Sequence, residues 1–285
     1  MIIDCKQIKQ QKIEKLKGKV NSLSFTPKLA IISAVGYDNA SSVYIKNKIK
    51  TCNEIGIDVE VIDLKYKEVD NKFSMLYRII NAIELLNSDN CINGIIVQLP
   101  LPYGITEKDF ADFIDWRKDV DGFNSINRGR LINGMDCLIP CTASAVMSVL
   151  PKDLSYKYIT LINRSGLIGL PLFKLLTDRN GTVTMCHSKT CNTQLDIACA
   201  DIVISAVGEA NFINIEDIQH SKIIIDVAIT RDEVGKLCGD IPKDKYDYLD
   251  KIGVKYTTVP NGIGILTCVE LANNVVKSCE LQELK

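Results

Sequence analysis

The stretch Ile159–Pro171, ITLINRSGLIGLP, decides the fold of the second half of the chain. Its first four residues are apolar or β-branched and predict a buried strand, and a helix is expected to begin near Leu170 and Pro171. The tight turn between them aims backbone N–H groups and the positive end of the helix outward, which suits a phosphate. Because Asn163 takes the first glycine position of the G-x-G-x-x-G pattern, the motif alone is only a weak indication of a nucleotide site.

The next predicted strand ends at Cys186–Lys189. A dinucleotide-binding domain that uses NAD often carries an acidic residue at this point, against the ribose hydroxyls. This chain has no acid there, and Arg164, Ser188 and Lys189 instead offer positive charge and hydrogen-bond donors, which favours the 2′-phosphate of NADP. The alternative is that Arg164 and Lys189 are solvated loop charges.

Short apolar runs rich in β-branched residues recur along the chain, and helical patterns lie between them. Such continuous runs are typical of strands that are covered on both faces. Strands are expected at residues 29–35, 57–62, 92–97, 159–162, 182–185, 201–206, 223–227 and 254–258. Helices are expected at residues 41–55, 72–87, 106–113, 142–150, 168–177 and 266–279. The alternation predicts an α/β fold with parallel sheets.

Length and composition favour two domains. The chain has 285 residues, which is enough for one large or two medium domains with a substantial core. A polar, glycine-bearing stretch at residues 124–136 precedes Cys137–Pro140, where we place the main boundary. We therefore expect a first domain over residues 1–138 and a Rossmann-like dinucleotide-binding domain over residues 139–265.

The charge balance argues against a large anionic partner. Lys and Arg total 34 and Asp and Glu total 35, so no overall attraction to nucleic acid or to an anionic membrane is indicated. No stretch of the sequence is long and apolar enough to span a bilayer. Eleven cysteines, without a CxxC pair or a leader segment, suggest reduced thiols in a cytoplasmic protein. Cys186 and His187 have too few neighbouring ligands to predict a metal site.

A lysine occupies an unusual position in the helix expected at residues 41–55. At about 100° per residue, Lys48 falls on the apolar arc of this helix, one turn after Tyr44. A buried ammonium group is so unfavourable that such a lysine usually has partners, loses its proton more easily or reaches a water-filled cleft. The polar residues of Gly36–Asn39 can cap the helix, and Gly56 can end it. The alternative is a snorkelling lysine at the rim of an ordinary packed face.

Polar residues also follow the strand expected at residues 92–97. Gln98 comes just before two prolines that cannot continue a β-ladder, so it lies at the strand end where open α/β sheets bind ligands. Farther along, Lys118–Phe123 (KDVDGF) presents Asp119 and Asp121 in a turn-forming context. The alternative is that both carboxylates only shape the turn.

Together these segments resemble the methylenetetrahydrofolate dehydrogenase/methenyltetrahydrofolate cyclohydrolase family. The resemblance runs from about Val35 to Thr267, and the order of its blocks makes it specific. The blocks are VGYDNASSVYIKNK, GIIVQLPLP, KDVDGF, PCT, RSGLIGLPL, TVTMCHSKT, AVG, IDV, GDI and VPNGIG. The resemblance implies two α/β domains around a cleft, with a C-terminal helix over residues 266–285 that packs back on the first domain, and a homodimer.

The resemblance also assigns roles to the matching residues of this chain. Lys48 is the expected catalytic lysine, Gln98 is expected to hydrogen-bond it, and Tyr44 is expected to pack beside it and orient the folate. Asp121 is expected to hold the pterin. The residues expected to bind NADP are Asn163, Arg164, Ser165, Ser188 and Ile229.

The implied activity is NADP-dependent oxidation of 5,10-methylenetetrahydrofolate to 5,10-methenyltetrahydrofolate, followed by hydrolysis to 10-formyltetrahydrofolate. The protein would supply proximity and exclude water until hydride has moved. Lys48 would transfer protons during hydrolysis if its surroundings make the neutral amine accessible. The alternatives are a monofunctional dehydrogenase or cyclohydrolase of the same fold, a folate-binding protein without turnover, and a dehydrogenase for a small hydroxy or keto acid.

The chain departs from the family pattern at several positions near the expected ligands. The family usually has glycine where this chain has Ala145, Asn163, Ala228 and Asn261, and proline where it has Trp116, Ala143, Thr258 and Ile265. Ala228 adds a methyl group where the backbone should approach the cofactor, and the absence of proline at Ile265 removes a constraint from a loop. Tyr44, Lys48, Gln98 and Asp121 are all present.

Overall fold

The computed structural model describes residues 1–34, 40–65, 71–218 and 220–283, and the chain divides into two compact units. The first unit comprises Gln11–Cys141 with Cys268–Lys285, and the second comprises Met1–Gln10 with Thr142–Thr267. The first ten residues belong to the second unit, where Ile2 forms a parallel bridge with Tyr256. Both units have a parallel sheet with helices, which confirms the predicted α/β class.

The first unit is built on a three-stranded sheet with the order β2-β1-β3. Its strands are β1 (Lys28–Ser33), β2 (Asp58–Asp63) and β3 (Gly94–Val97). Its helices are α2 (Ala40–Ile55), α3 (Lys72–Ser88), α4 (Glu107–Phe110) and α5 (Ser125–Ile132), with 3-10 turns at Pro102–Gly104 and Ala111–Phe113. Two further helices, α1 (Cys5–Asn21) and α10 (Ile263–Glu283), have several residues in each unit, and α6 (Cys141–Val149) has only its first residue in this one.

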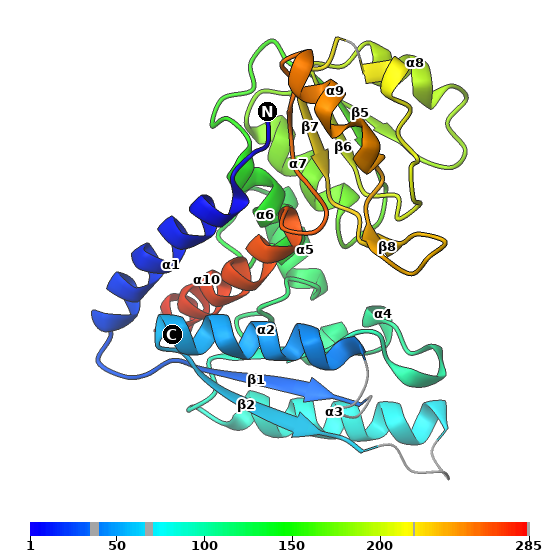
Figure 1. The fold of residues 1–285 in the computed structure, drawn as a ribbon. Coiled ribbons are helices and arrows are strands. Elements are labelled where there is room, and N and C mark those ends of the chain that lie inside the picture. Colours follow the sequence, from blue (N-terminus) through cyan, green and yellow to red (C-terminus); the bar gives the residue numbers. More distant parts are fainter. Residues whose placement is uncertain (35–39, 66–70, 219, 284–285) are drawn as a thin grey trace. The chain divides into compact units, whose positions relative to one another are not determined.

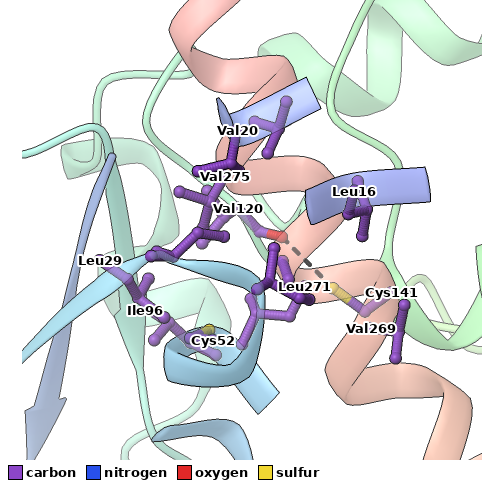
Figure 2. Packing of buried hydrophobic residues seen from close by; sticks show 14 of the residues in the cluster. Leu16, Val20, Leu29, Cys52, Ile96, Val120, Cys141, Val269, Leu271 and Val275 are labelled. Carbon is purple, nitrogen blue, oxygen red and sulfur yellow. Dashed lines mark hydrogen bonds between the residues drawn. The ribbon is translucent and has the colours of Figure 1, made fainter. Parts of the chain in front are cut away.

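Helices cover both faces of this sheet (Figure 1). Successive side chains of a strand point to opposite faces, so Leu29 and Ile31 of β1 pack with α2 and α10, whereas Ala30 and Ile32 pack with α3. Figure 2 shows the first of these two cores, to which α10 contributes Val275. Burial on both faces explains why the strands are continuous apolar runs.

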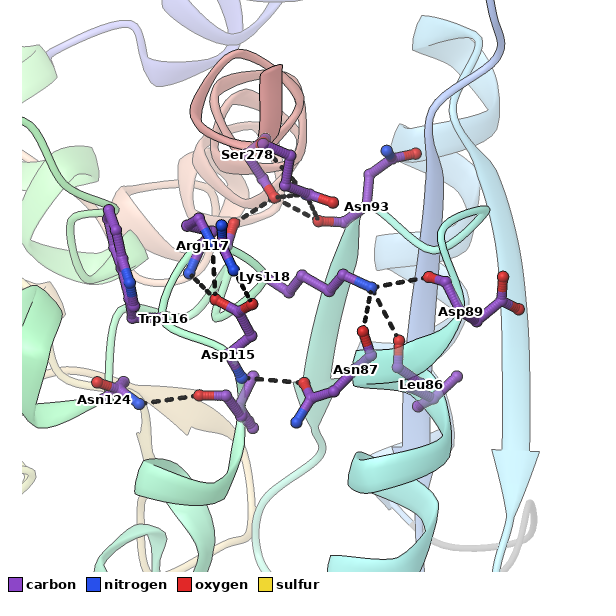
Figure 3. Close-up of polar contacts among 12 residues, drawn as sticks. Leu86, Asn87, Asp89, Asn93, Asp115, Trp116, Arg117, Lys118, Asn124 and Ser278 are labelled. Carbon is purple, nitrogen blue, oxygen red and sulfur yellow. Dashed lines mark hydrogen bonds and ion pairs between the residues drawn. The ribbon is translucent and has the colours of Figure 1, made fainter. Parts of the chain in front are cut away.

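The side chain of Lys118 caps the C-terminal end of α3 (Figure 3). Its buried amine donates hydrogen bonds to the carbonyl oxygens of Leu86, Asn87 and Asp89 at 3.0, 2.9 and 2.7 Å. A helix leaves its last carbonyls without internal partners, and a cation at that end is favourable. Lys118 therefore has a structural role and ties the KDVDGF segment to α3.

The second unit contains a five-stranded parallel sheet with the order β10-β7-β6-β4-β5. Its strands are β4 (Tyr158–Ile162), β5 (Thr182–Cys186), β6 (Ile202–Ser205), β7 (Ile223–Asp226) and β10 (Lys255–Tyr256), with a small hairpin of β8 (Thr230–Arg231) and β9 (Leu237–Cys238). Its helices are α6 (Cys141–Val149), α7 (Gly169–Asp178), α8 (Thr193–Ala198) and α9 (Tyr246–Lys251), with 3-10 turns at Ile215–Ile218 and Lys243–Lys245. The strand order reverses between β4 and β6, and such a reversal is where doubly wound sheets bind ligands.

Four helices, α1, α5, α8 and α9, were not expected from the sequence. The helix α1 lies before the first expected strand, and α5 lies within the stretch that we interpreted as polar connection. The side chain of Asn124 caps α5 by accepting the N–H of Ile126 at 2.8 Å. At the end of α2, Gly56 has a φ of +96°, which confirms it as a helix-terminating glycine. The proposed cap at residues 36–39 lies outside the described residues.

Among the described helices, none combines the length and the apolar character that a membrane span requires.

Candidate active site

Lys48 and Gln98 meet at the carboxyl edge of the first sheet. Lys48 is on α2, which comes after β1 in the chain, and Gln98 directly follows β3, the parallel neighbour of β1. The Lys48 Nζ donates a hydrogen bond to Gln98 Oε1 at 2.8 Å. Gln98 is buried, and its Nε2 donates to the Leu99 carbonyl at 2.5 Å, so the carboxamide is held with its oxygen toward the amine.

Asp121 brings a carboxylate close to this pair. Ile95 of β3 forms a parallel bridge with Asp119, so the KDVDGF segment runs beside β3 and carries Asp121 to the same edge. Burial raises the pKa of the Asp121 carboxyl, while the Lys48 cation and a hydrogen bond with the Cys141 thiol act in the opposite direction. The Lys48 ammonium group therefore has both a neutral acceptor and a carboxylate in its surroundings.

The turn after Asp121 requires glycine. Gly122 has a φ of +72°, and a Cβ atom at this position would lie 2.6 Å from the backbone nitrogen of Pro140. The side chain of Asn274 on α10 donates to the carbonyl oxygens of Val120 and Ile139, both at 2.8 Å. These contacts fix the backbone on either side of Asp121.

The two carboxylates of the KDVDGF segment have different surroundings. Asp119 is fully buried and accepts the backbone N–H of Asn124 at 2.8 Å and the Asn127 amide at 2.9 Å. Burial raises its pKa to about 7. Asp119 therefore shapes the turn, whereas Asp121 faces Lys48.

Tyr44 lies one turn before Lys48 on α2, and 47% of its surface is exposed. It forms no hydrogen bond with Lys48 in the described structure. Its ring is thus available for contact with a planar ligand, rather than being used inside the protein.

The second unit contains an open pocket of about 690 Å³ at the carboxyl ends of β4, β5 and β6. The strand ends contribute Ile162, Cys186 and Ala206 to its lining. This is the point where the strand order reverses, and the volume is within the usual range for small-molecule sites.

Four of the five residues expected to bind NADP line this pocket: Asn163, Arg164, Ser165 and Ser188. Ile229 is not part of the lining; it follows β7 and is 43% exposed. The pocket also includes Thr190, Gln194 and Phe212, which the sequence analysis did not single out. Thr190 and Phe212 lie in the loops after β5 and β6, and Gln194 lies at the start of α8, which follows β5. Their place after these strand ends is the signal that could have identified them.

The donors in this pocket fit a phosphorylated dinucleotide. Arg164 is exposed and forms no ion pair with another described residue. The exposed hydroxyls of Ser165 and Ser188 also line the pocket, and the loop that follows β5, residues 187–190, contains no acidic residue. This combination suits an anionic 2′-phosphate better than a free ribose hydroxyl.

A buried carboxylate holds the loop after β6. Asp240 is fully buried and accepts the Ser205 hydroxyl at 2.5 Å and the Val207 N–H at 2.8 Å. Its other oxygen accepts the N–H groups of Gly208 and Glu209 at 3.0 and 3.1 Å. Because Val207 and Glu209 line the pocket, Asp240 shapes the pocket without facing it.

A second buried carboxylate, Asp226, lies at the end of β7. It accepts the N–H groups of Ala228 at 3.2 Å and Ile241 at 2.9 Å. Burial, together with the charge of Asp240, raises the pKa of Asp226 to about 7. A Cβ atom at position 239 would lie 2.1 Å from the carboxylate of Asp226, so Gly239 is required there.

One departure from the family pattern has a clear structural outcome. Asn261 has a φ of +74°, a left-handed conformation that asparagine tolerates better than most residues other than glycine.

Within the described part of the chain, no group of three or more His, Cys, Asp or Glu residues is placed to hold a metal ion.

Comparisons with known proteins agree with this arrangement. A family model described as tetrahydrofolate dehydrogenase/cyclohydrolase, catalytic domain, matches residues 3–121, and a model described as the NAD(P)-binding domain of the same family matches residues 140–283. The bifunctional protein FolD of Streptococcus pyogenes (serotype M5, strain Manfredo) is 38% identical over 284 residues, which cover 97% of this chain and 96% of that protein.

Solved structures show the same similarity. The bifunctional FolD methylenetetrahydrofolate dehydrogenase/cyclohydrolase of Campylobacter jejuni is 35% identical, with a TM-score of 0.88 over 99% of each chain. The methylenetetrahydrofolate dehydrogenase-cyclohydrolase (FolD) of Trypanosoma brucei, in complex with NADP cofactor and an inhibitor, is 26% identical, with a TM-score of 0.86 over 100% of this chain and 99% of its own. The chain therefore belongs to the tetrahydrofolate dehydrogenase/cyclohydrolase family, as the order of its sequence blocks indicated.

Proposed function

We propose that this protein is a bifunctional enzyme that oxidises 5,10-methylenetetrahydrofolate with NADP and hydrolyses the resulting 5,10-methenyltetrahydrofolate to 10-formyltetrahydrofolate. The observation that carries the proposal is the hydrogen bond of Lys48 to Gln98, with Asp121 close to the same amine. The match of both halves of the chain to the catalytic and NAD(P)-binding models of one family supports it.

The two activities need two binding regions. We propose that residues 1–138 with helix 266–285 bind the folate, and that residues 139–265 bind the dinucleotide. Lys48, Gln98 and Asp121 lie in the first unit, and the pocket at the reversal of strand order lies in the second, in support of this division.

In the dinucleotide region, Arg164, Ser165 and Ser188 hold NADP, with Arg164 and Ser188 at its 2′-phosphate, and Asn163 and Ile229 lie at further cofactor positions. The Arg164 guanidinium, which forms no ion pair with another described residue, and the acid-free loop after β5 support this assignment. When bound, NADP accepts the hydride that leaves the bridging methylene carbon of the folate.

In the folate region, Lys48 moves the protons of the hydrolysis. The oxygen of water bonds to the methenyl carbon and releases its protons, and the bond from that carbon to N5 breaks as N5 takes up a proton. Gln98 fixes the direction of the Lys48 amine, which must reach the reacting atoms within hydrogen-bond distance. Asp121 accepts hydrogen bonds from the pterin, and the exposed ring of Tyr44 packs against the pterin.

The protein is also proposed to act in the cytoplasm as a homodimer. None of the cysteines in the described residues forms a disulfide, which agrees with a reducing compartment. Light scattering on the purified protein tests the dimer, and a monomeric mass at the concentration of the activity assay would contradict it.

The test of the activity has two arms. In the first, purified protein receives 5,10-methylenetetrahydrofolate and NADP or NAD, and the absorbance of reduced nicotinamide is followed. In the second, it receives 5,10-methenyltetrahydrofolate without a nucleotide, and the loss of the methenyl absorbance is followed. Activity in both arms is expected. No turnover in either arm at high protein concentration would refute the proposal, and turnover in one arm alone would identify a monofunctional enzyme.

A further inference from the structure

The side chain of Asn163 occupies the turn between β4 and α7. Its Oδ1 accepts the N–H of Ser165 and the hydroxyl of Ser165, both at 2.8 Å, and the N–H of Gly169 at 3.1 Å. Its Nδ2 donates to the carbonyl oxygen of Ala206 at 2.8 Å. Because backbone N–H groups only donate and a carbonyl only accepts, these partners fix which end of the carboxamide is the oxygen.

The donors that Asn163 uses are those that a phosphate would need. Gly169 is the first residue of α7, and the free N–H groups at a helix start are the usual partners of a bound anion. The hydroxyl of Ser165 also accepts the N–H of Ile168 at 3.1 Å. Three N–H groups and one hydroxyl of this turn are therefore already bonded within the chain.

The turn has little freedom to release these donors. Through Nδ2, Asn163 is tied to Ala206, and the residues that follow Ala206 are held by the buried carboxylate of Asp240. In addition, a Cβ atom on Gly169 would lie 2.3 Å from the Asn163 carbonyl oxygen, so α7 begins in close contact with the Asn163 backbone. An incoming phosphate would have to break several of these bonds and would meet the partial negative charge of Oδ1.

We propose that Asn163 closes this turn to phosphate with its own carboxamide, so that the dinucleotide is anchored by its 2′-phosphate at Arg164 and Ser188 and not by its pyrophosphate at the start of α7. Arg164 and Ser188 are exposed, line the same pocket and are absent from the Asn163 network. The inference rests on the proposed use of a dinucleotide and makes Asn163 a specificity-determining residue.

Calorimetric titration tests this with two probes, ADP and adenosine 2′,5′-bisphosphate. The wild-type protein is expected to bind the bisphosphate at least about tenfold more tightly than ADP, because only the bisphosphate reaches Arg164 with a 2′-phosphate. Asn163→Gly frees the turn donors and is expected to tighten ADP binding about tenfold, with a smaller gain for the bisphosphate. Asn163→Asp keeps the shape but adds a negative charge, and is expected to weaken ADP binding.

The matched control is Asn180→Gly. Asn180 follows α7, has a φ of +70° and bonds to Asp153, and it does not line the pocket. This variant is expected to leave both affinities unchanged. Unchanged or weaker ADP binding by Asn163→Gly would overturn the inference.

A second measurement uses the wild-type protein alone and so does not depend on how the variants fold. In amide NMR spectra, saturating ADP is expected to leave the Gly169 resonance nearly in place, because this N–H stays bonded to Asn163. A large shift of the Gly169 amide would show that phosphate displaces Asn163 and would overturn the inference. Failure of the wild-type protein to oxidise methylenetetrahydrofolate would instead overturn the proposed function, whatever the ADP titrations show.

Discussion

The amine of Lys48 and the carboxamide of Gln98, 50 positions apart in the sequence, are joined by a hydrogen bond of 2.8 Å. The parallel pairing of β1 with β3, in which Ile32 lies opposite Val97, brings α2 and Gln98 to one edge of the sheet. The sheet register thus brings together a lysine on a helix and the glutamine that follows a strand, and these two residues form the candidate site.

Replacement of Lys48 by methionine tests the proposed proton transfer. Lys48→Met keeps the length and apolar stem of the side chain but removes the amine, and hydrolysis of methenyltetrahydrofolate is expected to fall by at least about 100-fold. Lys50→Met, at an exposed position of the same helix, is expected to keep full activity. Circular dichroism checks that both variants are folded, and undiminished hydrolysis by a folded Lys48→Met would rule out its role.

Replacement of Gln98 tests whether this residue acts through Lys48. Gln98→Met removes the acceptor at nearly constant volume, and kcat for hydrolysis is expected to fall about 10- to 100-fold, the value of one hydrogen bond to a charged group. In the Lys48→Met background the same change should have little further effect, because the two residues act as one unit. Independent, multiplicative losses in the double variant would contradict this coupling.

Arg164 is expected to set the preference for NADP. Arg164→Gln should raise the KM for NADP about tenfold or more and leave the KM for NAD almost unchanged, because only NADP carries the 2′-phosphate. Arg231→Gln is a suitable control, since its guanidinium bonds to the Gly235 carbonyl in the β8–β9 hairpin, outside the pocket. Equal changes for both cofactors would show that Arg164 does not read the 2′-phosphate.

Asp240 is expected to position the pocket loop. Asp240→Asn replaces an acceptor oxygen with an NH₂ group that faces the N–H donors of the loop at Val207–Glu209. Because two donors then face each other, the loop should shift. The KM for NADP should rise about tenfold, with a smaller change in kcat. Asp232→Asn removes a similar loop contact to Val234 and Lys236 in the hairpin and should leave KM unchanged. A pure loss of thermal stability without a change in KM would show that Asp240 is only structural.

Two buried carboxyls give the protein a characteristic pH dependence of stability. The pKa values of Asp119 and Asp226 are raised to about 7 in the folded protein, compared with about 3.9 for an unfolded aspartate. Below about pH 3.9 the two carboxyl groups are protonated in the folded and in the unfolded protein, so neither group opposes folding. Between the two pKa values the unfolded state holds fewer protons than the folded state, so the free energy of unfolding falls as pH rises. Above about pH 7 this fall in the free energy of unfolding is complete.

Urea unfolding across this pH range measures the effect. Each group contributes a slope of at most about 1.4 kcal/mol per pH unit, and Asp119→Asn should remove one such contribution. Asp153→Asn serves as the control, because hydrogen bonds from Ser155 and Asn180 lower the pKa of this exposed carboxyl and place its titration below the range. A slope unaffected by Asp119→Asn would contradict the assignment.

The sequence predicted the parallel α/β class and most of the strands, because buried parallel strands are continuous apolar runs. It did not reveal α1, in which lysines and glutamines surround the buried Cys5 and three later buried positions, Ile13, Leu16 and Val20. The spacing of these three residues along one face is a weak but real helical signal. It did not reveal α5 either, because eight residues with a central glycine resemble a connecting segment.

The candidate site was predictable where a residue type conflicted with its position. Lys48 on an apolar arc and Gln98 at a strand end are both such conflicts. By contrast, Asn163 was interpreted through its backbone tolerance, whereas the structure uses its side chain to bond three donors and Ala206. Long-range partners of this kind, like the capping of α3 by Lys118, depend on tertiary structure and leave no periodic signal.

The contribution of α10 to the first unit constrains how the chain is made. Asn274 and Val275 complete the surroundings of Val120 and Leu29, although they come much later in the chain than these two residues. During translation, the segment that carries Lys48, Gln98 and Asp121 therefore waits with part of its apolar surface uncovered until α10 has been synthesised and has left the ribosome. Emergence of α10, and not synthesis of the segment with Lys48, Gln98 and Asp121, is the event that allows this unit to become native.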